Sequence, residues 1–203
     1  MLAPALIATT SPFLAYRKAT HIVAGFAGIV CLSFFLIQPL LAVGCLPGLH
    51  RSQQRKWHRR IGAAIVICVL LHVGFLFVTS PVDATDALLF AAPTPFSVYG
   101  VVAMWGVVLT AFLVMLRGRL GVTYPTWRLI HNGLALVVVV ATVIHALEIE
   151  GAMEAISKWA LCAVVLLTAG ITILDQFAIK PLSRLRARAK GAITDSRGAA
   201  QDG

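Results

Sequence analysis

The chain has 203 residues, of which 59% are hydrophobic and 12% are charged, and its formal net charge is +9. This composition is too apolar for a soluble globular protein, so it predicts an integral membrane protein. The positive charge does not indicate a nucleic-acid-binding protein, because the basic residues have no interleaved aromatic residues and belong to no nucleic-acid-binding motif.

The first sixteen residues are apolar but are interrupted by Pro4 and Pro12. They are too short to cross a bilayer, and they lack the basic start of a signal peptide. We therefore predict that residues 1–20 form an extracytoplasmic or interfacial segment. A sixth membrane span that includes sequence upstream of Met1 is left open as an alternative.

Five apolar stretches follow, each long enough or nearly long enough to cross a bilayer as an α-helix. They cover residues 22–43, 61–78, 98–116, 129–147 and 159–179. The sequence thus predicts an all-α fold, an integral membrane bundle of about five transmembrane helices over residues 21–180. A basic tail, residues 181–203, follows the last span.

The charged residues are distributed unevenly between the two sides that these spans define. All but three of the 17 basic residues lie between the first two spans, between the third and fourth, or after the fifth; the exceptions are Arg17, Lys18 and Lys158. The other side carries Asp83, Asp86, Glu148, Glu150 and Glu154. The positive-inside rule then predicts a bacterial-type inner membrane protein with its N-terminus outside and its tail in the cytoplasm.

Two histidine pairs have the same spacing: His58 with His72 in the segment WHRRIGAAIVICVLLHVGF, and His131 with His145 in the segment WRLIHNGLALVVVVATVIHAL. Fourteen residues of α-helix turn through about 1400°, about 40° short of four full turns, so each pair faces one side of its helix. A lone histidine on an apolar face is usually a core residue. Two equally spaced pairs are hard to ascribe to packing, and ionisable groups at membrane depth are candidates for function.

The predicted orientation makes the second and fourth helices parallel. His58 then faces His131 near the cytoplasmic surface, and His72 faces His145 near the outer surface. Facing imidazoles hold a six-coordinate haem, so we predict that all four histidines are metal ligands in two haem sites.

Several neighbours of the histidines fit the same interpretation. Arg59, Arg60 and Arg128 place cations where the propionates of an inner haem would emerge, although the positive-inside rule explains them equally well. Gly62, one turn after His58, would let a flat macrocycle approach the helix. The four cysteines form no CxxC motif and are interpreted as small apolar filling residues.

The motifs HRRIG followed by LLH, and WRLIHN followed by VIH, resemble the ferric reductase-like transmembrane domain. That domain is shared by ferric reductases, NADPH oxidases and the haem subunit of the bacterial periplasmic methionine sulfoxide reductase system. The resemblance covers roughly residues 17–184. It implies two b-type haems stacked across the membrane and bound by His58, His72, His131 and His145.

Ferric reductases and NADPH oxidases commonly continue into a cytoplasmic flavin and nicotinamide domain, whereas this chain ends about two dozen residues after the last span. No glycine-rich dinucleotide motif follows Ile179. The resemblance therefore implies a separate electron donor, a quinol or a partner protein that contributes a flavin. The chain differs from the sulfoxide reductase subunit because it has a histidine at position 58 and lacks that subunit's extra first helix.

The expected function is transmembrane electron transfer from this donor to an extracytoplasmic acceptor, which is ferric iron, oxygen or a periplasmic protein. The chain would then be an oxidoreductase component. Arg17, Lys18 and His21 would attract an anionic iron chelate or hold the propionates of the outer haem, unless they are ordinary interfacial residues.

Three alternatives stay open. The chain would be a haem-bearing membrane subunit that passes electrons to a periplasmic reductase, or a haem-binding scaffold without turnover. It would otherwise be a transporter whose histidines relay protons or bind metal ions, which predicts carboxylates within the spans. Asp175 is the one acidic residue placed inside a predicted span.

Overall fold

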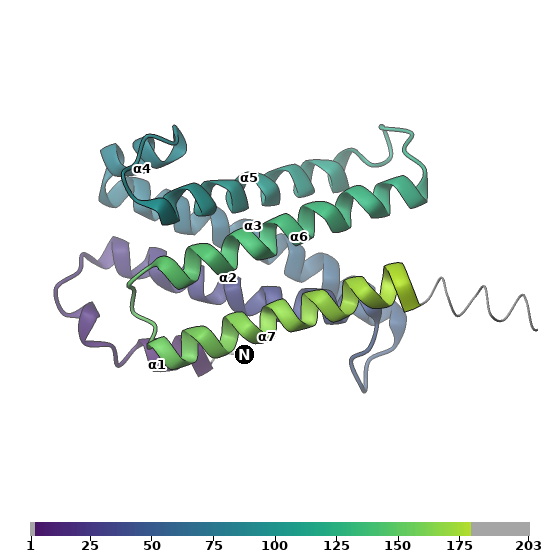
Figure 1. Ribbon diagram of the computed structural model, residues 1–203, viewed down its shortest axis with the longest axis horizontal. Helices are drawn as coiled ribbons and strands as arrows, with labels where there is room; N and C mark the ends of the chain where they lie inside the picture. The colour runs from purple at the N-terminus through teal and green to yellow at the C-terminus, as the bar shows by residue number, and fades with distance from the viewer. Residues whose placement is uncertain (1–2, 180–203) are drawn as a thin grey trace, which may run out of the picture. The chain divides into compact units, whose positions relative to one another are not determined.

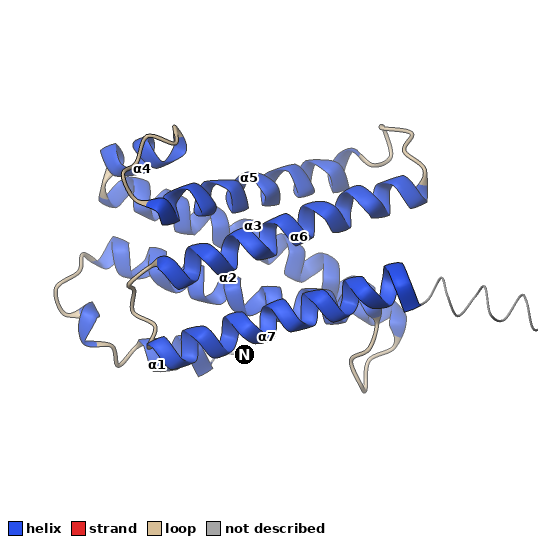
Figure 2. Cartoon of the chain, viewed as in Figure 1, coloured by secondary structure: helices blue, strands red, loops and turns tan. Residues whose placement is uncertain are grey.

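The structure is a computed structural model that describes residues 3–179 (Figure 1). Within this range every regular element is a helix (Figure 2), which confirms the all-α fold. The described chain divides into two units, the first of which ends at Ala169. The predicted basic tail, residues 181–203, lies outside the described residues.

Five of the described helices are long and apolar enough to cross a membrane. They are α2 (Ala19–Val43), α3 (Arg51–Thr79), α5 (Pro95–Leu116), α6 (Tyr124–Glu148) and α7 (Ala155–Leu174). A short π-helix, Asp175–Ile179, continues from α7. The chain is therefore a multi-pass membrane protein, as its composition predicted.

The helix α3 begins at Arg51, well before the apolar run that predicted its start near residue 61. The polar segment RSQQRKWHRR is rich in Arg, Gln and Lys, which favour helix as much as most apolar residues do. The His50 backbone N–H donates to Gln53 Oε1 at 2.9 Å and closes the first turn. His58 consequently lies inside α3, on the same continuous helix as His72.

Three short helices were not predicted. They are α1 (Ala3–Ala8), the 3₁₀-helix Pro12–Leu14 and α4 (Pro81–Leu88). Each is too short to cross a bilayer. The helix α4 has Pro81 in its first turn, where the missing N–H costs no hydrogen bond, and the Ser80 hydroxyl donates to Asp83 Oδ2 at 2.6 Å.

The long helices of the first unit pack as two hairpins, α2 against α3 and α5 against α6. Figure 1 shows α5 and α6 side by side along their length. Gly44 ends α2 in the left-handed conformation, with φ 77°, and its N–H donates to the Leu40 carbonyl at 3.1 Å. The short connections require each hairpin to be antiparallel, so α3 and α6 have equivalent places in the two hairpins.

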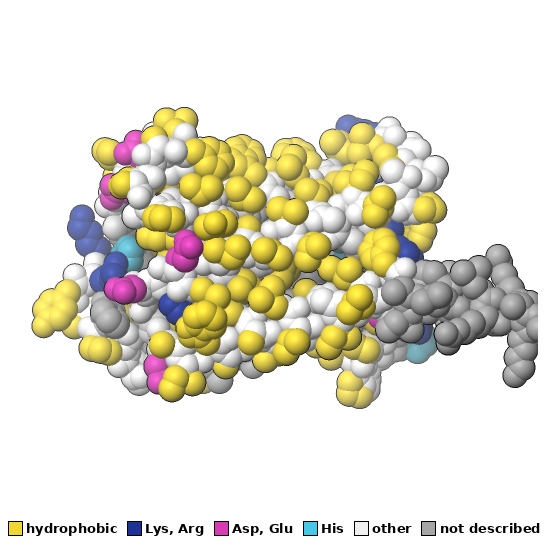
Figure 3. Space-filling view, in the orientation of Figure 1, with side chains coloured by type: hydrophobic (Ala, Val, Ile, Leu, Met, Phe, Trp, Pro, Cys, Tyr) yellow, Lys and Arg dark blue, Asp and Glu magenta, His cyan; other side chains and the backbone are white. Residues whose placement is uncertain are grey.

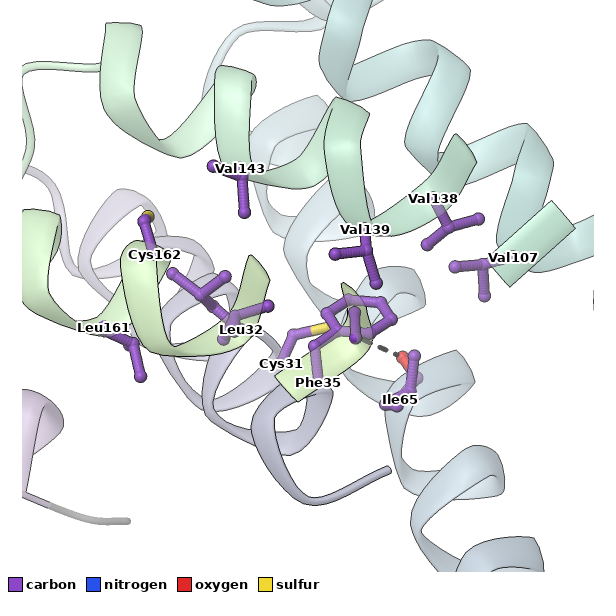
Figure 4. Close-up of a cluster of buried hydrophobic side chains, with 12 residues drawn as sticks. Cys31, Leu32, Phe35, Ile65, Val107, Val138, Val139, Val143, Leu161 and Cys162 are labelled. Atoms are coloured by element: carbon purple, nitrogen blue, oxygen red, sulfur yellow. Dashed lines mark hydrogen bonds between the residues drawn. The ribbon is translucent and has the colours of Figure 1, made fainter. Parts of the chain in front are cut away.

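A buried apolar cluster joins the two hairpins and α7 (Figure 4). Ile65 of this cluster is seven residues from both His58 and His72, and Val138 is seven residues from both His131 and His145. The cluster therefore lies at the level midway between the two histidine positions. Its members are Cys31, Leu32, Phe35, Ile65, Val107, Val138, Val139, Val143, Leu161, Cys162, Val165 and Ala169.

The outer faces of the helices carry large apolar side chains (Figure 3). Leu70 and Val78 of α3 are 63% and 66% exposed, and Phe112 of α5 is 54% exposed. Exposed apolar area of this extent is unfavourable in water but is what the hydrocarbon of a bilayer accepts. The surface thus supports the membrane location independently of helix length.

Candidate functional site

The structure brings the four predicted histidines together as two couples, each with one ring from α3 and one from α6. The ring centroids of His58 and His131 are 6.3 Å apart, with an angle of 65° between the ring planes. The centroids of His72 and His145 are also 6.3 Å apart, at 85°. We refer to these as the His58/His131 couple and the His72/His145 couple.

This separation suits one metal atom held between two imidazoles. Metal–nitrogen bonds of about 2.0 Å and a ring radius of about 1.1 Å place the centroids of two opposed ligands roughly 6–6.5 Å apart. The rings are too far apart to bond each other directly. The two couples therefore have the spacing of ligand pairs.

Backbone carbonyls orient three of the four rings. The Nδ1 atom of His72 lies 2.8 Å from the Ala24 oxygen on α2, and that of His145 lies 2.7 Å from the Phe96 oxygen on α5. His58 Nδ1 lies 3.1 Å from the Gln38 oxygen. Because a carbonyl only accepts, each ring must carry its proton on Nδ1, and the Nε2 lone pair stays free for a metal.

Two glycines that the sequence interpretation overlooked allow this contact in the His72/His145 couple. A Cβ atom at Gly28 would lie 3.2 Å from His72 Nδ1, and one at Gly100 would lie 2.7 Å from His145 Cε1. Each glycine is one helical turn after the residue whose carbonyl accepts, Ala24 or Phe96. The sequence signal is this equal spacing of glycine and acceptor in the two hairpins.

A cavity of 620 Å³ extends between the rings of the His72/His145 couple. Cavities of roughly 300–1,000 Å³ are typical of sites for organic cofactors and ligands. Its walls are largely apolar and include Leu32, Val69, Val101 and Met104. The couple therefore lies in a space that accepts a large apolar group.

Unpaired polar atoms gather around the other couple. His131 Nδ1, Trp127 Nε1 and Gln38 Oε1 are buried and have no hydrogen-bond partner among the described residues. Gln38 contacts His58 twice, because its Nε2 also donates to the His58 carbonyl at 3.1 Å. Buried polar atoms normally have partners, so this concentration fits a site that receives a further group with polar edges.

The arginines predicted beside the His58/His131 couple differ in their burial. Arg59 and Arg60 are exposed, and the Arg60 guanidinium lies 5.3 Å from the centroid of the Trp57 ring. Arg128 is partly buried on α6. Their role in binding a cofactor stays a prediction.

Gly62 has a different role from the one predicted. A Cβ atom there would lie 3.1 Å from Gln38 Nε2, so the absent side chain leaves room for the Gln38 amide rather than for a macrocycle. The sequence interpretation failed because Gln38, on another helix, occupies the space beside Gly62.

A second cavity, of 630 Å³, is lined by Pro12, Tyr16, Arg17, Lys18, His21 and Thr79. His21 and Thr79 also line the cavity of the His72/His145 couple, so the two spaces adjoin. Arg17 Nη1 lies 2.8 Å from His21 Nε2. The structure thus places Arg17, Lys18 and His21 in a cavity that adjoins the one beside the His72/His145 couple.

The residues of the two couples fit a haem better than a bare metal ion. Among residues 3–179 no group of three or more His, Cys, Asp or Glu side chains is placed to hold a metal. Two imidazoles are too few for a protein-bound zinc ion, but they are the two axial ligands that a haem iron takes. The donor set, the cavity and the ring spacing all fit haem.

The fold and site define a class: a multi-pass membrane protein with two couples of facing histidines, about 21 Å apart along α3 and α6. Residues 24–142, more than half of the chain, match the family described as ferric reductase like transmembrane component. The chain belongs to the ferric reductase-like transmembrane family, and this membership confirms the resemblance found in its histidine motifs.

Domains of this family generally bind haem and work with separate redox partners, and membership indicates transmembrane electron transfer. The matched region contains His58, His72 and His131 and ends three residues before His145. Neither the curated proteins nor the solved structures yielded a match.

Proposed function

We propose that this chain holds two b-type haems and conducts electrons across a membrane between a donor and an acceptor on opposite sides. His58 and His131 are the proposed ligands of one haem, and His72 and His145 those of the other. The observation that carries the proposal is the equal separation of 6.3 Å between the rings of both couples.

When bound, a haem supplies an iron that changes between the ferric and ferrous states and so carries one electron at a time. The chain would hold each haem by two imidazoles, one from α3 and one from α6. With two protein ligands on each iron, an acceptor would receive its electron at the edge of the site and would not bond to the metal.

The chain also surrounds the proposed path between the couples with apolar side chains and orients the ligand rings. The buried cluster that includes Phe35, Ile65 and Val138 supplies apolar side chains between the two levels. Carbonyl oxygens fix three of the rings from neighbouring helices. Ligands held in this way move little when the charge of the site changes, which favours fast electron transfer.

The proposed orientation rests on the charge asymmetry of the sequence. Basic residues adjoin the His58/His131 end of α3 and α6, and by the positive-inside rule this supports a proposed position of the couple near the cytoplasm, in a bacterial-type inner membrane. The proposed donor is a separate flavoprotein or a quinol. The proposed acceptor is ferric iron, oxygen or a periplasmic protein, and the cavity lined by Arg17, Lys18 and His21 favours one with negative charge.

The test is an optical spectrum of the full chain, purified from a host supplied with haem. We expect the absorption of a reduced bis-histidine b-type haem, with two haems per chain by extraction and assay. Replacement of all four histidines by alanine is the matched control and should abolish the absorption. Colourless wild-type protein would overturn the proposal.

A further inference from the structure

The four histidines follow one rule with a single exception. Along α2, the acceptors of the two α3 histidines are Ala24 and Gln38, which are fourteen residues apart. Along α5, the acceptor of His145 is Phe96, and the position fourteen residues later is Thr110. His131 forms no such bond there, because its Nδ1 is buried and has no partner in the described chain.

An aromatic ring takes the place of the missing bond. The indole of Trp127 stacks on the His131 imidazole, with centroids 5.1 Å apart and ring planes within 13° of parallel. Trp127 is one helical turn before His131. The corresponding positions before the other three histidines hold Gln54, Cys68 and Ala141, none of which offers a flat ring.

Other side chains in turn support Trp127. The Arg117 guanidinium at the end of α5 lies 4.2 Å from the centroid of the indole. The Tyr124 ring also stacks on it, with centroids 6.2 Å apart and planes 29° from parallel. A cation close to an indole face is attracted to it, so the Arg117 guanidinium and the Tyr124 ring together restrict the indole.

We propose that Trp127 is a positioning residue that fixes the plane of the His131 imidazole by ring stacking, as backbone hydrogen bonds fix the other three. This inference rests on the proposed function, since it assumes that His131 binds a haem. An imidazole whose Nδ1–H has no acceptor donates less electron density to its metal than one that is hydrogen-bonded. The haem at the His58/His131 couple therefore has a higher reduction potential than it would have if the Nδ1–H of His131 were hydrogen-bonded.

The test compares three variants of the full chain loaded with haem. Trp127→Leu removes the flat ring but keeps an apolar side chain, and Trp127→Phe keeps a ring that stacks. Trp105→Leu is the matched control, because Trp105 lies on α5 and is 50% exposed. The readouts are haem content, electron paramagnetic resonance of the two ferric low-spin centres, and a redox titration.

In Trp127→Leu we expect the resonance of one centre to change, because the angle between its ligand planes is no longer fixed. A His131 ring that is free to turn can form a hydrogen bond through Nδ1 as the other three do, so the ratio of reduced to oxidised centre should fall about tenfold at a fixed ambient potential, a shift of about 59 mV for one electron. Trp127→Phe should restore both readouts, and Trp105→Leu should leave them unchanged. Loss of one haem in Trp127→Leu, restored in Trp127→Phe, also supports the proposal.

The inference is overturned if Trp127→Leu leaves both centres unchanged, if it alters both equally, or if Trp127→Phe is as damaging as Trp127→Leu. These results are distinct from a failure of the proposed function, which would appear as wild-type protein without haem.

Discussion

The two histidine couples have equal spacing but are built by different means. In the His72/His145 couple, both rings bond to carbonyls of neighbouring helices, and two glycines make room for them. In the His58/His131 couple, one ring bonds to a carbonyl and the other stacks on Trp127. The main chain thus orients the first of these couples, and side chains share that task in the second.

This difference predicts where each couple is vulnerable. A carbonyl cannot be removed by substitution, so the His72/His145 couple should tolerate most changes except the addition of a side chain at its glycines. The His58/His131 couple depends in addition on the indole of Trp127, which substitution can remove.

Replacing a ligand should remove one haem and spare the other. In His72→Ala we expect the haem content to fall by half, because the apolar cluster around Ile65 and Val138 separates the two levels. His131→Ala should give the same loss from the other couple. Haem per chain and the number of redox steps measure the outcome. Equal loss of both haems from either variant would show that the couples fold as one site.

Gly100→Ala should strongly reduce haem binding at the His72/His145 couple. The added Cβ would lie 2.7 Å from the His145 ring, which is closer than carbon contacts permit. We expect several-fold lower occupancy of one haem only, by extraction and assay. Gly133→Ala is the control, because nothing lies within 4 Å of a Cβ there. If the two variants bind haem equally, the ring does not lie against Gly100.

Gly28→Ala should have the same effect to a smaller degree. Its Cβ would lie 3.2 Å from His72 Nδ1, a contact that a shift of a few tenths of an ångström relieves. We expect two haems to remain, with a change in the resonance of one centre. An effect larger than that of Gly100→Ala would reverse the predicted order of the two glycines.

Gln38→Leu should have the smallest effect. It removes the donation from Nε2 to the His58 carbonyl but keeps the backbone oxygen that orients the His58 ring. We expect a loss of about 1 kcal/mol in stability, the usual worth of one hydrogen bond, with both haems retained. Thermal unfolding with haem absorption as the probe measures it. Loss of a haem in this variant would mean that the Gln38 side chain, rather than its carbonyl, positions His58.

Much of the site was predictable because its signals are local in the sequence. The spacing of His58 from His72, and of His131 from His145, predicted the facing couples. The start of α3 at Arg51 lies before the predicted apolar stretch, because apolar residues begin only at Ile61. The polar residues from Arg51 to Arg60 nevertheless have high helix propensity. The role of Gly62 was mistaken because its neighbour, Gln38, belongs to a different helix.

The sequence by itself determined the five membrane-crossing helices and the shared helix face of each histidine pair. Hydrophobicity and the 3.6-residue repeat are properties of a single segment, so both can be recognised in the sequence without the structure. Only the tertiary structure decided what orients each ring, a carbonyl for His58, His72 and His145 and the indole of Trp127 for His131. The physical reason is that these contacts depend on how closely neighbouring helices approach and on which residue of each turn faces the other, and no single segment encodes either.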